Sequence, residues 1–237
     1  MDPRDGDPES ASRSGDRLLS TLSERERDAL LGTARRRRFR SGEVVFHFGD
    51  PVGDVHLILA GRFALYVMQP TGEEAMLRIL GPGDMFGEMA LFESDSSRSA
   101  TVRAMQPGET ASIDRRSFNA LRQGKPDLTD ALLAILADKV RRGDAQLLEA
   151  LFVPAEVRVL RRLVELVEVY AVGESSGSAA ESGVVIPLRQ EDLATLAGTS
   201  RATVNRVLRV EQGRGAVDLH RGRITVLDVD GVRKRSR

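Results

Sequence analysis

Short apolar runs separated by turn-forming residues dominate the chain between residues 42 and 114. Each run is five to seven residues long, rich in Val, Ile, Leu and Phe, and bounded by Gly, Pro or Asp. Strands of this length at this spacing are typical of an antiparallel barrel or jelly roll. The predicted strands are Glu43–Phe48, Val55–Ala60, Arg62–Met68, Ala75–Ile79, Ser99–Ala104 and Glu109–Ile113.

Helical spacing of apolar residues precedes this β region. Residues 18–31 form a short helical pattern in which Ser23 is an N-cap and Glu26, three residues on, completes a capping box. Residues 1–16 are rich in Asp, Arg, Ser and Gly, and this composition predicts a disordered tail. The basic run Arg35–Arg38 is predicted to be a solvated stretch ahead of the first strand.

A heptad seam follows the β region. Apolar residues recur every seven positions in one row, and small or apolar residues fill the second row. Such a seam predicts a helix that pairs with a second copy of itself, because its apolar stripe would otherwise face water. The alternative is a helix that packs on its own barrel. Pro154 ends the pattern, so we expect a hinge between Leu147 and Pro154. The predicted dimer interface consists of Leu133, Leu136, Val140 and Leu147, with Gly143 and Ala150 in the second row.

The last third of the chain has the pattern of a winged helix-turn-helix. A helical pattern, Glu156–Val172, is followed by the Ser/Gly-rich stretch Gly173–Gly183, which predicts a flexible loop. The segment LRQEDLATLAGTSRATVNRVLRV then predicts two short helices that turn at Gly198, with Thr199 or Ser200 capping the second. The predicted wing consists of strands Val217–Leu219 and Arg223–Leu227, with His220 in the turn between them.

Composition narrows the functional classes. The chain is 41% hydrophobic and 30% charged, as in a globular protein. It has no cysteine and three histidines, which excludes disulfides, thiolate metal sites and cysteine nucleophiles. We find neither a Ser/His/Asp set nor paired carboxylates, so we predict no enzyme and no catalytic or metal residues. With neither a signal peptide nor a membrane-length apolar run, we expect a cytoplasmic protein without a membrane partner.

Positive charge concentrates at the C-terminal end, although the formal net charge is zero. Residues 201–237 contain ten basic and four acidic side chains. A short helix that offers arginines and an asparagine suits the major groove, because Arg binds guanine edges or phosphate and Asn binds adenine. The alternatives are a helical hairpin with solvated arginines and, for residues 233–237, a frayed cationic tail. The predicted DNA-binding residues are Gln190, Ser200, Arg201, Ala202, Thr203, Asn205, Arg206 and Arg209.

The motif GPGDMFGEMALFESDSSRSATVRA has the chemistry of a phosphate cradle. The turn Gly87-Glu88-Met89 opens a short helix whose free N–H groups can face an anion. Arg98, ten residues after Glu88, can return to pair with the charge, and Ser99 adds a hydroxyl. A ribose hydroxyl that donates to Glu88 would explain a carboxylate beside a phosphate site. The alternative is a turn glycine beside a surface ion pair between Glu88 and Arg98.

Together these features resemble the cyclic-AMP receptor protein family of bacterial transcription regulators, the Crp/Fnr superfamily. The resemblance covers residues 18–228 and rests on GDPVGDVHLILAGRFALYV, on FGEMALF followed by RSA, on the long helix and on SRATVNRVL. It implies an α+β fold with an N-terminal cyclic-nucleotide-binding β jelly-roll barrel, a long dimerisation helix and a C-terminal winged helix-turn-helix. The predicted parts are a disordered tail (1–16), the barrel domain (17–126), the dimerisation helix (127–152) and the DNA-binding domain (153–237).

The resemblance also assigns roles to the pocket residues. Glu88 would hold the ribose, and Arg98 and Ser99 the cyclic phosphate. Members that respond to cyclic AMP usually carry a Thr-Ser or Thr-Asn pair on the dimer helix, and Gly143 and Asp144 stand there in this chain. The ligand-binding set implied by the resemblance is Gly87, Glu88, Met89, Arg98, Ser99 and Ala100, with Lys139, Gly143 and Asp144 contributed by the long helix.

The sequence therefore predicts a homodimeric regulator that binds a near-palindromic operator in double-stranded DNA. A cyclic nucleotide such as cyclic AMP, or a related small effector, is expected in the barrel, and the family resemblance adds RNA polymerase as a partner. No cofactor is required. Ala202 stands where the family usually has a glutamate, so we do not expect the usual operator. The alternatives are a cyclic-nucleotide-binding signalling module that acts through protein partners, and an effector-independent regulator with a vestigial pocket.

Overall fold

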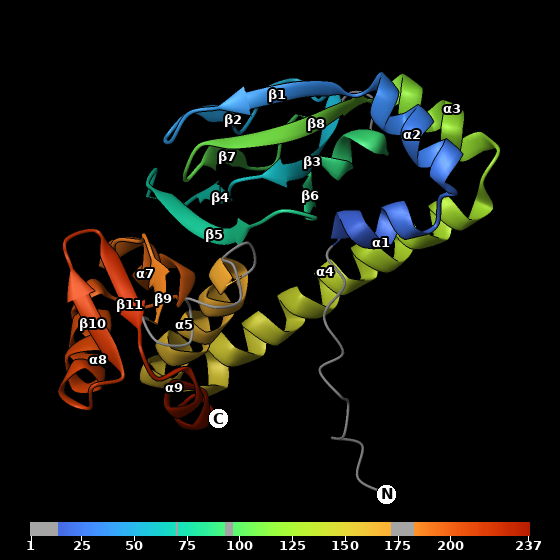
Figure 1. The fold of residues 1–237 in the computed structure, drawn as a ribbon. Coiled ribbons are helices and arrows are strands. Elements are labelled where there is room, and N and C mark those ends of the chain that lie inside the picture. The colour runs from blue at the N-terminus through green and yellow to red at the C-terminus, as the bar shows by residue number, and fades with distance from the viewer. Residues whose placement is uncertain (1–13, 70, 93–96, 172–182) are drawn as a thin grey trace, which may run out of the picture.

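The computed structural model describes residues 14–69, 71–92, 97–171 and 183–237. A β-rich domain and a smaller, mainly helical C-terminal domain are joined by one long helix that passes beside both (Figure 1). Within the described ranges, no helix is long and apolar enough to cross a membrane.

Two short helices precede the β domain, where the sequence suggested one helical pattern. They are α1 (Ser14–Ser20) and α2 (Glu24–Thr33), and Ser23 forms the predicted capping box with Glu26. Helix α1 begins at Ser14, so the expected disordered tail is wrong for residues 14–16, and the rest of that tail lies outside the described residues. These residues are ordered by a contact with a distant part of the chain. The Gly15 N–H donates to the carbonyl of Gly83 at 2.9 Å.

Two antiparallel four-stranded sheets form the β domain. They give a jelly-roll-like double sheet, which confirms the predicted jelly roll, and the two sheets do not close into a barrel. Phe39, Phe63 and Phe86 pack between the sheets, with the rings of Phe39 and Phe63 5.7 Å apart. The first sheet has the order β1 (Arg35–Phe39), β8 (Gly108–Asp114), β3 (Asp54–Ala60), β6 (Met85–Phe86), and the second β2 (Val44–Phe46), β7 (Thr101–Ala104), β4 (Phe63–Met68), β5 (Glu74–Leu80).

Strand β1 corrects the interpretation of the arginine run. Arg35–Arg38 is part of a strand rather than a stretch ahead of one, because its backbone pairs with β8 in a register that ends at Phe39 opposite Gly108. Its four arginines are exposed, as expected, and Arg36 and Arg38 form ion pairs with Glu109. Only Phe39 is buried, so the strand carries no apolar alternation that a sequence pattern could reveal.

The long helix, α4, runs from Pro126 to Phe152 and has two different halves. It follows α3 (Arg115–Gln123), and its first half buries Leu128, Leu132 and Ile135 with residues of the β domain and of α1–α3. Beyond Ile135 no residue of α4 is buried, although all of the helix lies within the described residues.

The C-terminal domain contains the predicted helix-turn-helix and wing. Its elements are α5 (Ala155–Ala171), β9 (Val184–Ile186), α7 (Gln190–Leu196), α8 (Arg201–Gly213), β10 (Val217–His220), β11 (Arg223–Val226) and α9 (Val229–Arg235), with strand order β10-β11-β9. His220 ends β10 instead of lying in the turn, because it pairs with Arg223. Apart from Gly183, the expected loop Gly173–Gly183 falls outside the described residues.

Helix α9 corrects the interpretation of the basic C-terminus as a frayed tail. Val232 is completely buried, and the Arg235 Nε donates to the buried Glu211 at 3.1 Å. One apolar anchor and one buried ion pair therefore order a segment whose composition resembles a tail.

The two domains share one apolar core. Tyr66 and Met76 of the β domain belong to the same buried cluster as Leu193 and Ala194 of α7. Arg62 is buried as well, and its guanidinium donates to the carbonyls of Val169 and Tyr170 at 2.9–3.1 Å, at the end of α5. These contacts hold the C-terminal domain against β4 and β5.

Candidate functional site

The phosphate cradle is built where β6 ends. Gly87 follows Phe86 with φ of 80°, and the 3-10 helix η1 (Glu88–Leu91) begins immediately after it. A Cβ at Gly87 would lie 2.7 Å from Nη1 of Arg98 and 3.0 Å from the carbonyl oxygen of Asp54. Gly87 therefore combines left-handed backbone with a close approach, and it brings the predicted residue Arg98 against the turn.

Arg98 is bound by an acidic residue of its own chain. Its side chain is 5% exposed, Nη1 donates to the Asp54 carbonyl at 2.9 Å, and Nη2 donates to Asp54 Oδ1 at 2.5 Å. The guanidinium also lies 4.0 Å from the centre of the Phe46 ring. The buried Nε of Arg98 has no hydrogen-bond partner among the described residues.

Asp54 is the centre of a polar network that sequence analysis missed. Ser112 Oγ donates to Oδ2 of Asp54, and the buried His56 places Nε2 3.3 Å from that oxygen. Burial alone would raise the pKa of Asp54. The close contact of His56, the hydrogen bond from Ser112 and the charge of Arg98 outweigh burial and hold the pKa of Asp54 well below its usual range. The available signal was the strand DVHLILA, in which Asp54 and His56 share one face at period two.

His56 is fixed on both sides. Its ring stacks on Phe86 with centres 4.9 Å apart, and Nδ1 lies 3.0 Å from Thr110 Oγ1 of β8. Because β3, β8 and β6 are neighbours in one sheet, pairing of these strands brings Asp54, His56 and Ser112 together.

Glu88 pairs with the long helix. The buried Glu88 carboxylate accepts a hydrogen bond from Lys139 Nζ of α4. The alternative of a surface ion pair between Glu88 and Arg98 is therefore wrong, because both side chains are buried and each has another partner. A side chain of α4 thus reaches the cradle, as the match of Lys139 to the family suggested.

The remaining predicted pocket residues are more exposed. Met89 is 41% exposed, Ser99 is exposed, and Ala100 is half-buried. Gly143 and Asp144 lie on the exposed second half of α4. The structure thus brings Gly87, Glu88, Arg98 and Lys139 together, whereas Ser99 is exposed and the Arg98 guanidinium binds Asp54.

The second candidate site is the outer face of α8. The Ser200 Oγ caps this helix by accepting from the Thr203 N–H at 3.2 Å, and Gly198 turns the chain with φ of 58°. Val204, Val207 and Leu208 are buried, which leaves the predicted polar residues facing outward. Their contacts are Arg201 with Glu191, Asn205 with Gln190, Arg206 with Glu156, and Arg209 with Gln212.

One face of α4, from Leu133 to Phe152, presents a wide apolar stripe. Leu133, Val140 and Leu147 are 55%, 64% and 60% exposed, and Leu136 is half-buried. Leu148, Leu151 and Phe152 extend the stripe and were not predicted, because they lie outside the first heptad row. A monomeric protein rarely exposes so many large apolar residues side by side.

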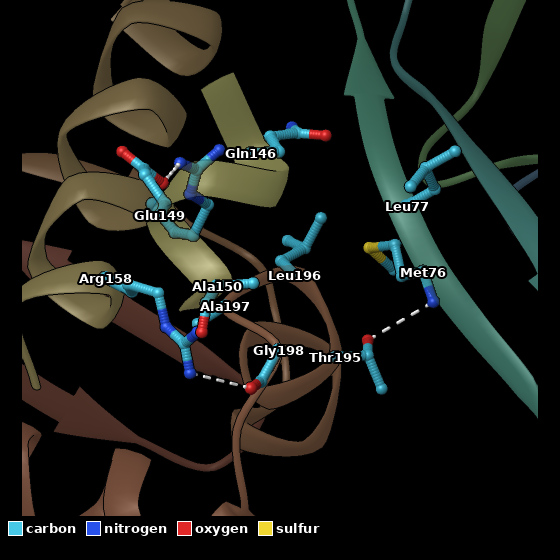
Figure 2. Close-up of a pocket in the computed structure, with 11 residues that line it drawn as sticks. Met76, Leu77, Gln146, Glu149, Ala150, Arg158, Thr195, Leu196, Ala197 and Gly198 are labelled. Atoms are coloured by element: carbon cyan, nitrogen blue, oxygen red, sulfur yellow. Dashed lines mark hydrogen bonds and ion pairs between the residues drawn. The ribbon is translucent and has the colours of Figure 1, made fainter. Parts of the chain in front are cut away.

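The end of α4 contacts the turn in front of α8. Arg158 donates to the carbonyl of Ala150 and to that of Gly198, both at 3.0 Å. Figure 2 shows these residues beside a cavity of about 160 Å³, with Met76 of β5 on its other side. Val153 and Pro154, at the predicted hinge, separate α4 from α5.

No cluster of three or more His, Cys, Asp or Glu residues that could hold a metal ion occurs in the described part of the chain.

Comparison with known proteins identifies two domain families in the chain. Residues 36–125 match the cyclic nucleotide-binding domain family, and residues 157–235 match the Crp-like helix-turn-helix domain family. The chain is 32% identical to the "Cyclic AMP receptor protein" of Thermus thermophilus over 90% of this chain and 93% of that protein. It is 30% identical to the "CRP-like cAMP-activated global transcriptional regulator" of Mycobacterium tuberculosis strain H37Rv, over 84% and 87% of the two chains.

Solved structures give the same result. The catabolite activator protein of Thermus thermophilus is 31% identical, with a TM-score of 0.53 over 93% of this chain and 98% of that chain. The c-di-GMP responsive global regulator CLP of Xanthomonas campestris, at 23% identity, shares the fold with a TM-score of 0.71 over 86% and 99%.

Proposed function

The chain belongs to the Crp/Fnr superfamily, and on this premise we propose that it is a homodimeric transcription regulator that binds a near-palindromic operator and is modulated by a cyclic nucleotide or related anionic effector. The observation that carries the proposal is the exposed polar face of α8, where Arg201, Asn205 and Arg206 project from a helix that is capped and buried on its other side. Such a face fits the major groove.

The dimer places two such helices on DNA. With α4 pairing to α4 of a second copy, the two recognition helices would contact half-sites about 34 Å apart, one turn of the duplex. The apolar stripe around Val140 and Leu147 supports this arrangement. RNA polymerase is the further partner that we propose, and the cytoplasm is the proposed location.

The effector is proposed to bind at Gly87, Glu88 and Arg98. The relatives named as cAMP-activated support a cyclic nucleotide. Gly143 and Asp144 give α4 a different surface from the Thr-Ser or Thr-Asn pair of most cyclic-AMP-responsive members, so we propose the class of effector and not cyclic AMP itself. Such a ligand raises DNA affinity only if it binds the DNA-binding conformation of the dimer more tightly than the other conformation.

One observation favours a second candidate function. Arg98, the residue that we propose binds the phosphate, is already paired with Asp54. This pairing fits an effector-independent regulator with a vestigial pocket, because such a protein does not need an arginine that is free to bind a phosphate.

Selection of binding sites from random DNA tests the proposed DNA recognition. The wild type is expected to enrich a two-fold symmetric motif. Arg201→Ala should cost about 1–3 kcal/mol and relax one base position in each half-site if Arg201 binds guanine in bidentate fashion. A wild type that enriches no motif, or a motif without two-fold symmetry, would contradict the proposal.

Sedimentation at micromolar concentration tests the dimer. The wild type is expected to sediment as a dimer, and Val140→Glu as a monomer, because it would place two like charges in the seam. Arg116→Glu, at an exposed position of α3 outside the stripe, provides a control that should leave the dimer intact. A monomeric wild type would refute the proposed assembly.

A further inference from the structure

The proposed effector site contains a group that has no role in binding an anion, the carboxylate of Asp54. We infer that Asp54 is an internal counter-anion that competes with the effector phosphate for Arg98 and thereby sets the affinity of the pocket. The inference rests on the proposed function, since it concerns the same pocket.

The first argument is the occupancy of the guanidinium. Asp54 engages Arg98 twice, through its backbone carbonyl at Nη1 and through its carboxylate at Nη2. These are the nitrogens at the end of the side chain, which bind carboxylate and phosphate in the same forked geometry. A phosphate that binds Arg98 must therefore take Nη2 from Asp54 or share it with a second anion.

The second argument is incomplete satisfaction of the arginine. Nε of Arg98 is buried and has no acceptor within the described residues, although Arg98 itself is 5% exposed. Buried donors are usually paired, so this nitrogen can donate to an acceptor that a ligand or a water supplies. Asp54 thus satisfies part of the guanidinium and leaves one donor for a ligand.

The third argument is the position of the acid. The Asp54 side chain is 26% exposed and reaches solvent, whereas Arg98 does not. Ser112 of β8 and His56, which lies on the same strand as Asp54, hold the carboxylate in place. An anionic ligand therefore approaches Arg98 past a fixed negative charge, which repels it at short range.

A structural role for Asp54 predicts the opposite result. If Asp54 only oriented Arg98 for the phosphate, its loss would release the arginine and weaken ligand binding. If Asp54 competes with the phosphate, removal of its charge strengthens binding. The sign of the change therefore separates the two roles.

The test is calorimetry of the full-length protein with cyclic AMP and, separately, with inorganic phosphate. Asp54→Asn keeps the shape and one acceptor oxygen but removes the charge, and we expect it to bind at least about tenfold more tightly than the wild type. Asp50→Asn is the matched control, because it removes one negative charge from the neighbouring loop. Asp50 contacts Arg98 only through its backbone, and its carboxylate accepts from the His47 N–H at 2.7 Å. The control should bind like the wild type.

Ser112→Ala is the second variant, and it decides the matter if Asp54→Asn does not fold by circular dichroism. It leaves the carboxylate in place but removes the Ser112 hydroxyl that holds it, so a smaller gain in affinity is expected.

Each outcome decides the inference. Tighter anion binding by Asp54→Asn, or by Ser112→Ala in its place, supports it, and equal or weaker binding than the wild type overturns it. If cyclic AMP binds no variant but inorganic phosphate binds Asp54→Asn more tightly than the wild type, the inference stands and cyclic AMP is not the effector. If no variant binds either anion, the inference is overturned. If the wild type binds cyclic AMP as tightly as Asp54→Asn does, the proposed effector class stands and the inference fails.

Discussion

Two ion pairs of equal length have different surroundings in this protein. Arg98 binds Asp54 in the pocket at 2.5 Å, and Arg206 of α8 binds Glu156 of α5 at the same distance. The side chains of the pocket pair are 5% and 26% exposed, whereas those of the α8 pair are 65% and 46% exposed.

Burial and not distance decides what each pair does. An exposed pair contributes about 0–1 kcal/mol to folding, so Arg206 can exchange its carboxylate for a DNA phosphate at little cost. A buried pair is different, because removal of one partner leaves a charge in a poorly solvated site. The arginine of the pocket therefore contributes to folding stability as well as to the proposed effector site, whereas the arginines of α8 contribute little to folding stability.

The largest expected effect is on folding stability. Arg98→Ala should lower the free energy of unfolding by about 3 kcal/mol, because it removes the guanidinium that binds the largely buried carboxylate of Asp54. Arg206→Ala should change it by no more than about 0.5 kcal/mol, as is usual for exposed residues. Urea unfolding followed by circular dichroism measures both. Equal losses of unfolding free energy in the two variants would contradict the distinction between the buried and the exposed ion pair.

The next effect is on effector binding. Arg98→Ala should weaken binding of a cyclic nucleotide by about 1.5–3 kcal/mol, the range for a lost charge-assisted hydrogen bond. Arg206→Ala, far from the pocket, should bind the nucleotide like the wild type. Calorimetry up to millimolar nucleotide provides the measurement, and an affinity unaffected by loss of Arg98 would remove this residue from the proposed site.

A smaller effect is expected in the salt dependence of DNA binding. If Arg206 neutralises one phosphate, Arg206→Ala should reduce the slope of log affinity against log salt concentration by about one. Arg98→Ala, measured without effector, should leave this slope unchanged. Fluorescence anisotropy from 50 to 200 mM salt would provide both slopes, and a slope altered only in Arg98→Ala would reverse the assignment.

The smallest expected effect is on the pH dependence of stability, and it concerns a third arginine, Arg62. Its guanidinium lies 4.4 Å from the centre of the Tyr170 ring. Burial raises the pKa of Tyr170 to about 12, although the Arg62 charge opposes the rise. Because the folded pKa exceeds the unfolded value of about 10, this phenol stabilises the fold fully below pH 10, and the contribution is lost as pH rises to 12.

The chain suits an optical titration because it has two tyrosines and no tryptophan. Burial raises the pKa of Tyr66 as well. Absorbance at 295 nm should therefore show two phenolates near pH 10 in urea and little phenolate at pH 10 in the native protein. If both phenols ionise near pH 10 in the native protein, Tyr170 is exposed to solvent and is not buried against Arg62.

The predicted family and the α+β fold are confirmed, and the successes share a physical cause. The capping box at Ser23 and the turns at Gly198 and Gly87 are local features, set by residues a few positions apart. Their geometry follows from backbone preferences that the sequence displays directly.

The failures concern contacts between distant residues. Arg98 was predicted to lie in the pocket, but its partner Asp54 is 44 positions away and meets it only after the sheet forms. Strand β1 exists because β8 pairs with it, and α9 is ordered by Glu211 of α8. No local pattern encodes such partners. The roles of the individual site residues remain predictions.

The core shared by the two domains affects how the chain is made. Tyr66 and Met76 belong to strands that are synthesised long before α7 and α8, which cover them in the finished protein. At about 5–20 residues per second, the ribosome needs on the order of ten seconds to add the remaining hundred or so residues. During that time the β domain can fold while this apolar face is still uncovered. The nascent chain is then open to aggregation, and the helix-turn-helix that reads DNA also acts as the cover that completes the β domain.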